Sequence, residues 1–174
     1  TLAAGSLAAG ALAACAPRAA QKAIAAGGSG SGSLDSVAAF NAARRFAKTP
    51  FGEIAYVDRG NGPAALFLHG FPLNSYQWRG AIDRLSPYRR CVAPDSMGLG
   101  YTRPAPGQSV TPADQVQMLA YLLDQLHIGT VDLIANDSGG AVAQLFMTMH
   151  PERVRTVLLT NCDVEIDSPP PKVK

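Results

Sequence analysis

Hydrophobic positions divide the chain into short blocks from about residue 37 onward. Two alternating runs, 44–49 and 53–58, flank Pro50-Phe51-Gly52 and predict a β-hairpin. Apolar segments bounded by turn residues predict strands that are buried on both faces of a sheet. These segments are residues 64–68, 91–93, 131–135 and 154–160.

Apolar residues recur at helical spacing between these segments. The spacing predicts helices over residues 76–85, 112–126 and 140–149. The second is the clearest, because Thr111 can cap its first turn and Pro112 suits the first helical position. Strands that alternate with helices predict an α/β fold, with a mostly parallel sheet and helices on both faces.

The first 15 residues have a different pattern, with no charge and an apolar run of 14 residues. This run is shorter than the roughly 20 residues that span a bilayer, and has the length of a signal-peptide core. Leu12-Ala13-Ala14-Cys15 resembles a bacterial lipobox, in which the cysteine becomes lipidated. We therefore expect export to a bacterial cell envelope with a lipid anchor at Cys15; the alternative is an alanine-rich helix with an incidental cysteine.

Residues 16–36 are rich in alanine and contain a Gly/Ser run at 27–33. Such a run predicts a flexible tether, although an engineered fusion scar has the same composition. Residues 37–174 then form the one folded domain.

Composition and charge narrow the classes of function. The chain has 174 residues, of which 47% are hydrophobic, so it is long enough to bury a core and is not disordered. Residues 1–48 carry five basic and one acidic side chain, whereas 49–174 carry ten and twelve. The near-neutral body excludes nucleic-acid binding, and the three cysteines match no zinc pattern.

Three loops follow predicted strands and bring chemically useful residues to one edge of the sheet. They are His69-Gly70-Phe71-Pro72, the loop at 95–100, and Ala135-Asn136-Asp137-Ser138-Gly139-Gly140. In the third loop, small residues lie two positions before and two after Asp137. A strand that turns sharply into a helix needs this spacing, so we expect Asp137 beside a helix N-terminus, whose amides favour negative charge.

These loops, followed by His150-Pro151-Glu152-Arg153-Val154, resemble the α/β-hydrolase family from about residue 44 to 168. The local sequence is most similar to haloalkane dehalogenases and epoxide hydrolases, where aspartate replaces serine at the turn. The resemblance implies that Asp137 is a nucleophile that forms an ester intermediate with a small, largely apolar substrate. It also implies an oxyanion hole from the backbone N–H groups of Phe71 and Ser138, and no cofactor or metal.

The sequence departs from that branch at two positions. Phe71 and Ser138 stand where haloalkane dehalogenases usually have the Asn and Trp that hold the halide. One alternative makes Ser138 the nucleophile of an esterase, with Asn136 where a small residue belongs. A second makes Asp137 a helix cap, and a third makes the protein a non-catalytic member that binds a ligand or partner.

Other residues have weaker signals. Trp78 is a candidate for lining the pocket, with packing of its own helix as the alternative, and Asp163 is a candidate for the supporting acid. None of His69, His127 and His150 occupies the place of the family's base, which follows the last strand. We therefore expect a fold truncated after about the sixth strand, and a 174-residue chain that is inactive because it lacks the catalytic histidine.

Overall fold

The computed structural model describes residues 32–162. The signal-like segment 1–15 with Cys15, most of the tether at 16–36, and Asp163 lie outside the described residues. The predictions made for them therefore stay predictions.

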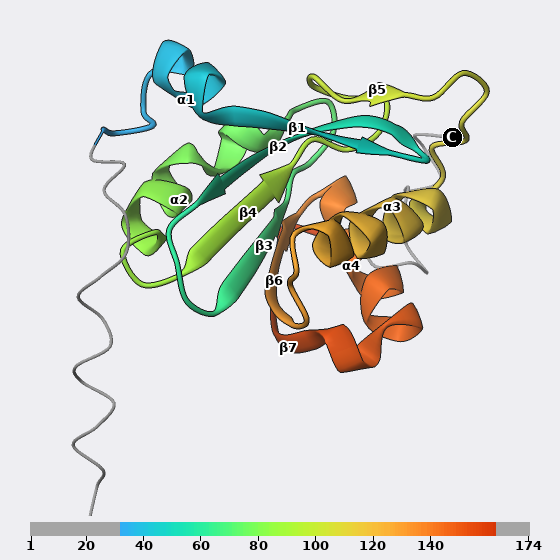
Figure 1. The fold of residues 1–174 in the computed structure, drawn as a ribbon. Helices are drawn as coiled ribbons and strands as arrows, with labels where there is room; N and C mark the ends of the chain where they lie inside the picture. The colour runs from blue at the N-terminus through green and yellow to red at the C-terminus, as the bar shows by residue number, and fades with distance from the viewer. Residues whose placement is uncertain (1–31, 163–174) are drawn as a thin grey trace, which may run out of the picture.

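The described chain forms one seven-stranded sheet (Figure 1). Its order is β1-β2-β4-β3-β6-β7, and β5 pairs with β2. The pairs β1–β2, β2–β4 and β2–β5 are antiparallel, and the pairs among β3, β4, β6 and β7 are parallel. The strands are β1 (Arg44–Thr49), β2 (Gly52–Arg59), β3 (Ala64–Leu68), β4 (Arg90–Pro94), β5 (Arg103–Pro104), β6 (Val131–Asn136) and β7 (Val154–Thr160).

Helices cover both faces of this sheet, which confirms the predicted α/β architecture. The helices are α1 (Val37–Ala43), η1 (Ser75–Trp78), α2 (Arg79–Leu85), α3 (Pro112–Gln125), α4 (Ser138–Met149) and η2 (Pro151–Arg153). The helix predicted over 76–85 is instead a 3₁₀ turn followed by α2. Neither α1 nor the two-residue strand β5 was predicted from the sequence.

Alternation along β3 explains how the two layers form. Leu66 and Leu68 face the core beneath α3 and α4, whereas Ala65 and Phe67 face the core beneath α1 and α2. All five residues of β3 are buried. A strand that is apolar at every position suits the centre of a sheet with helices on both sides.

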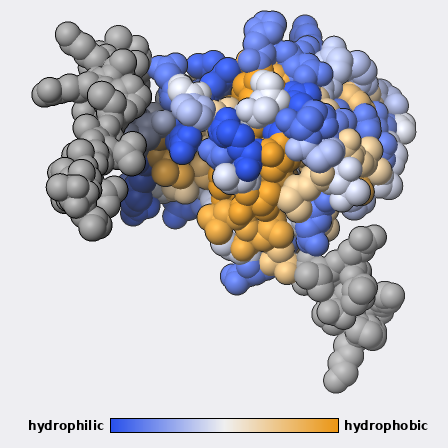
Figure 2. Space-filling view, turned by 90° about the horizontal axis from the view of Figure 1, so that it is seen from below, coloured by the Kyte–Doolittle hydropathy of each residue, from blue (hydrophilic) through white to orange (hydrophobic). Residues whose placement is uncertain are grey.

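The strand β7 differs from the other parallel strands. The prediction that residues 154–160 are buried on both faces is wrong, because Val157, Leu158 and Leu159 are exposed. Within the described part of the chain, β7 pairs only with β6 and forms one edge of the sheet, opposite β1. It lies at the lower side in Figure 1, and Figure 2, seen from below, shows an apolar region on that side.

Candidate active site

Asp137 occupies the turn between β6 and α4, where the strand changes direction into the helix. Its φ of 52° and ψ of −130° lie outside the usual regions for a residue with a side chain. Gly139 approaches β3 so closely that a Cβ there would lie 2.7 Å from the carbonyl oxygens of Leu68 and His69. The small residues around Asp137 therefore allow the sharp turn that their spacing predicted.

The carboxylate of Asp137 contacts the loop that follows β3. Its Oδ1 accepts a hydrogen bond from the backbone N–H of Phe71 at 2.9 Å. A Cβ on Gly70 would lie 2.6 Å from the Cβ of Asp137, so the loop reaches this position because residue 70 has no side chain. Asp137 is the N-cap residue of α4, yet its side chain makes no capping hydrogen bond, which argues against a simple capping role.

Backbone amides lower the pKa of this carboxyl group. Hydrogen bonds from the backbone of Ser138 and then of Phe71 lower the pKa of Asp137, whereas its partial burial acts in the opposite direction. The hydroxyl of Ser138 adds to the lowering. The site therefore favours the negative charge of Asp137 and places two amide donors beside it.

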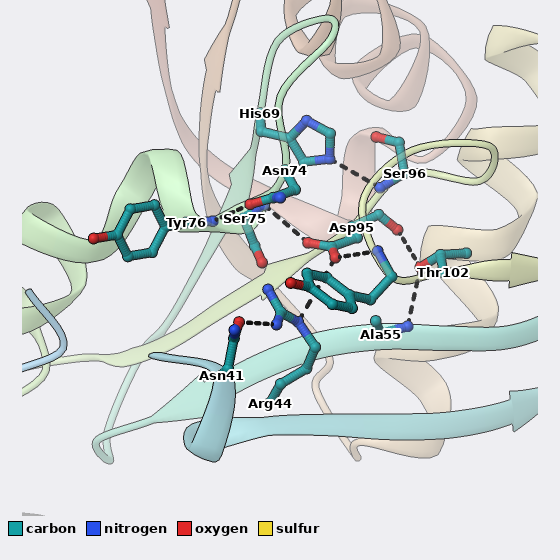
Figure 3. A network of polar contacts seen from close by, with 11 residues as sticks. Asn41, Arg44, Ala55, His69, Asn74, Ser75, Tyr76, Asp95, Ser96 and Thr102 are labelled. Carbon is teal, nitrogen blue, oxygen red and sulfur yellow. Dashed lines mark hydrogen bonds and ion pairs between the residues drawn. The ribbon is translucent and has the colours of Figure 1, made fainter. Parts of the chain in front are cut away.

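His69 connects the loop after β3 to the loop after β4 (Figure 3). Its Nε2 accepts from the backbone N–H of Ser96 at 3.0 Å, which leaves Nδ1 to donate to the carbonyl of Gly70 at 3.0 Å. Burial lowers the pKa of His69. Both ring nitrogens are thus engaged by backbone groups, which suits a structural histidine rather than a base.

Asp95 binds backbone groups of the segment that follows β3 and of the loop that follows β4 (Figure 3). It is fully buried and accepts hydrogen bonds from the backbone N–H groups of Ser75 at 2.8 Å and Tyr101 at 2.9 Å. The Nε of Arg44 lies 3.7 Å from its Oδ2, and the guanidinium of Arg44 stacks 3.8 Å from the centre of the Tyr101 ring. These contacts show that the buried carboxylate of Asp95 holds the loop after β4 in place.

A cavity of about 350 Å³ lies between α3, α4 and the loops after β3 and β4. Its lining is mostly apolar and includes Met97, Met118 and Val142, and no lining residue carries a charge. Phe71 and Ser138, whose backbone groups flank the Asp137 carboxylate, also line it. Asp137 itself is not among the lining residues, so a neutral, apolar molecule in this cavity lies next to the two residues whose amides flank the carboxylate.

Comparison with known proteins agrees with this geometry. The family described as "alpha/beta hydrolase fold" matches residues 63–172. The chain belongs to this family. The hydrolase fold explains the shared edge at which the loops after β3, β4 and β6 meet, because its strands present their carboxyl ends there.

Individual relatives indicate the branch of the hydrolase family. The chain is 40% identical over 102 residues to a haloalkane dehalogenase of Mesorhizobium japonicum, covering 58% of this chain and 33% of the relative. It is 41% identical over 117 residues to epoxide hydrolase 2 of Siraitia grosvenorii, covering 66% and 36%. The chain thus spans about a third of the length of these curated relatives. Their names support the dehalogenase and epoxide hydrolase branch that the sequence resembles.

A solved structure has a similar fold over about two thirds of this chain. The crystal structure of epoxide hydrolase VrEH1 from Vigna radiata matches with a TM-score of 0.63 and 34% identity. The match covers 67% of this chain and 38% of that chain.

Trp78, the candidate for lining the pocket, lies away from the cavity in this hydrolase fold. The ring of Trp78 packs 5.5 Å from that of Phe67 on the face of the sheet covered by α1 and α2, and Trp78 is not among the lining residues of the cavity. Trp78 therefore lies where the alternative interpretation, packing of its own helix, places it. Residues 32–162 contain no cluster of three or more potential metal ligands and no helix that could span a membrane.

The sequence pattern indicated no role for Gln77, and Asn136 entered the predictions only as an obstacle to Ser138 as the nucleophile. The two side chains are hydrogen bonded to each other at 2.7 Å across 59 residues of sequence. No periodicity or motif connects positions so far apart. The one signal in the sequence is that each of the two amide residues lies close to a predicted site loop.

Proposed function

We propose that the protein is a hydrolase that attacks a small, largely apolar substrate with Asp137 and forms an ester intermediate. The observation that carries this proposal is the hydrogen bond from Phe71 N–H to Asp137 Oδ1, made at the turn between β6 and α4 beside an uncharged cavity. Relatives named haloalkane dehalogenase and epoxide hydrolase support the same chemistry.

In the first step, the carboxylate oxygen that Phe71 does not bind attacks a saturated carbon of the substrate. A carbon–oxygen bond forms while the bond to a halide or an epoxide oxygen breaks, and the leaving atom takes the electron pair. In the second step, water attacks the ester carbonyl carbon of Asp137. The charge that develops on the carbonyl oxygen is stabilised by the N–H groups of Phe71 and Ser138. The tetrahedral intermediate then loses its bond to the alkyl oxygen, which leaves as an alcohol, and the carboxylate of Asp137 is restored.

The second step needs a base to deprotonate water. Both ring nitrogens of His69 contact backbone groups, and His150 follows the opposite end of α4 from Asp137, about 18 Å away along a 12-residue helix. His127 precedes β6, at the opposite end of that six-residue strand from Asp137, or about 20 Å away. We therefore place the base outside residues 32–162, and expect the 174-residue chain to stop at the ester.

We favour Asp137 over Ser138 because residue 137 has the positive φ of the turn, whereas Ser138 is the first residue of α4. An esterase using Ser138 would be labelled at that serine by a fluorophosphonate and would keep its activity in Asp137→Ala. A non-catalytic member would bind an apolar probe in the cavity and form no adduct.

The test is to incubate the 174-residue chain, in which the ester is expected to accumulate, with 1-bromobutane and to search the digested protein by mass spectrometry. We expect a butyl ester on the peptide that contains Asp137, absent in Asp137→Ala. The control Asp124→Asn removes an exposed carboxylate that pairs with Arg153 in another part of the molecule, and should leave the ester. Absence of the ester from the wild-type protein, or its presence on another residue, would refute the proposal.

We also propose the lipid anchor at Cys15, supported by the lipobox-like residues 12–15. In a bacterium that expresses the full leader, the protein should partition into detergent, and Cys15→Ser should move it to the aqueous phase. Cys162→Ser is the matched control and should leave partitioning unchanged. Equal partitioning of Cys15→Ser and the wild type would refute the anchor.

A further inference from the structure

Two side-chain amides connect the three segments that surround Asp137. The Oε1 of Gln77, on η1, accepts from the backbone N–H of Gly70 at 3.0 Å. Its Nε2 donates to Asn136 Oδ1 at 2.7 Å. The Nδ2 of Asn136 in turn donates to the carbonyl of Thr160, at the end of β7, at 2.7 Å. We call Gln77 and Asn136 the amide bridge.

The amide bridge works in only one orientation. Gln77 must present its oxygen to Gly70 and its NH₂ to Asn136, and Asn136 must present its oxygen to Gln77 and its NH₂ to Thr160. A carboxylate at position 77 has no donor for Asn136, and a hydrocarbon has neither donor nor acceptor. The chemistry of the bridge therefore specifies an amide at position 77.

The ends of the bridge lie next to the atoms that define the carboxylate geometry. Gly70 directly precedes Phe71, the amide donor, and Asn136 directly precedes Asp137, the acceptor. The N–H of Asp137 also faces the carbonyl of Thr160 at 3.4 Å. The bridge thus joins the backbone on both sides of the Phe71–Asp137 hydrogen bond. Neither Gln77 nor Asn136 lines the cavity.

We propose that Gln77 and Asn136 are positioning residues that set the distance between the Phe71 N–H and the Asp137 carboxylate. The inference rests on the proposed function, because the distance matters for a carboxylate that attacks substrate and later carries the oxyanion. A displacement of about 1 Å at a reacting group can lower a rate by about 100-fold. The bridge acts through the two loops and contributes no group to the substrate.

The kinetic test uses the 174-residue chain with Gln77→Met or Gln77→Glu, and 1-bromobutane as the probe. In both variants we expect the rate constant for esterification of Asp137 at saturation to fall about 10- to 100-fold, with the half-saturating concentration unchanged. Asn136→Leu combined with Gln77→Met should lose no more than the larger single loss, because both break one bridge.

The matched control is Gln125→Glu. Gln125 is an exposed amide whose Nε2 donates to the carbonyl of Lys48 at 3.1 Å, at the far end of α3. The same change of amide to carboxylate there should leave the rate constant unchanged.

Hydrogen–deuterium exchange gives a readout that does not depend on Asp137 chemistry. The amides of residues 69–73 should exchange faster in Gln77→Met than in the wild type, while those of α3 should not. If the wild type forms no ester but this exchange changes, the proposed function fails and the link made by the bridge is supported. Unchanged exchange and an unchanged rate constant would overturn the positioning role. A loss seen only as a higher half-saturating concentration or a lower melting temperature would also overturn it.

Discussion

The carboxylate of Asp137 is surrounded by groups that prefer its charged form. Hydrogen bonds from the backbone of Ser138 and Phe71 outweigh the effect of burial, so the pKa of Asp137 lies below its ordinary value of 3.8. This direction matters for the proposed chemistry, because the carboxylate, and not the neutral acid, attacks carbon. In the proposed mechanism, the same amides that lower the pKa also stabilise the oxyanion formed when water attacks the Asp137 ester.

A pH profile tests this direction. Because the pKa is lowered from 3.8, more than half of the carboxyl stays charged at pH 3.8, and the esterification rate with 1-bromobutane at that pH should exceed half of its neutral-pH value. Circular dichroism at each pH shows whether the protein is still folded. A rate that is already halved above pH 3.8 in folded protein would mean that burial dominates over the amide donors.

Gly139 permits α4 to lie directly against the end of β3. A Cβ there would meet two carbonyl oxygens at 2.7 Å, so Gly139→Ala must displace backbone. We expect a loss of about 1–3 kcal/mol in the free energy of unfolding, measured by urea denaturation. Gly129→Ala is the control, since its added Cβ meets nothing within 4 Å, and it should change stability by less than about 0.5 kcal/mol. Equal effects of the two substitutions would contradict this account.

At the scale of elements, one buried ion pair ties the first strand to the loop after β4. Arg44, at the start of β1, and Asp95 have side chains that are 3% and 0% exposed. The Nη1 of Arg44 donates to Asn41 Oδ1, whereas its Nε and Nη2 make no hydrogen bond, so the charge of the guanidinium is balanced by Asp95 and faces the Tyr101 ring. The antiparallel hairpin and the site loops are thereby held as one unit.

Asp95→Asn should therefore be strongly destabilising. It leaves the buried guanidinium of Arg44 without a counter-charge, which costs about 3–5 kcal/mol of unfolding free energy. Urea denaturation checks this, with Asp124→Asn as the control. Asp124 is 68% exposed and pairs with Arg153, so its loss should cost less than about 1 kcal/mol. A loss for Asp95→Asn as small as for the control would contradict the counter-charge argument.

The elements differ in how far the sequence predicts them. The strands β3 and β6 were predictable because an apolar run between turn residues is a local signal, and the turn at Asp137 because small residues must flank it. In contrast, β5 is two residues long and exists through its pairing with β2. The bridge from Gln77 to Asn136 joins residues 59 positions apart, so only folding brings it together.

At the scale of the whole molecule, helices cover the centre of the sheet, whereas the edge strand β7 leaves apolar side chains exposed. Both faces of β3 lie under helices, whereas β7 has exposed apolar side chains and, among residues 32–162, pairs only with β6. Figure 2 shows the resulting apolar region on the side where β7 lies. The site loops follow the central strands β3, β4 and β6, whereas β7 offers an apolar edge to a second molecule.

An exposed, apolar edge strand is a template for pairing with another strand. We therefore expect the 174-residue chain to self-associate through β7, where Leu158 is 56% exposed. Leu158→Lys places a charge on this edge, and should increase the monomeric fraction in sedimentation velocity while leaving the melting temperature nearly unchanged. Tyr88→Lys, which replaces a side chain 69% exposed in the turn after α2, is the control and should leave association as in the wild type. If both variants associate equally, contacts away from β7 hold the molecules together.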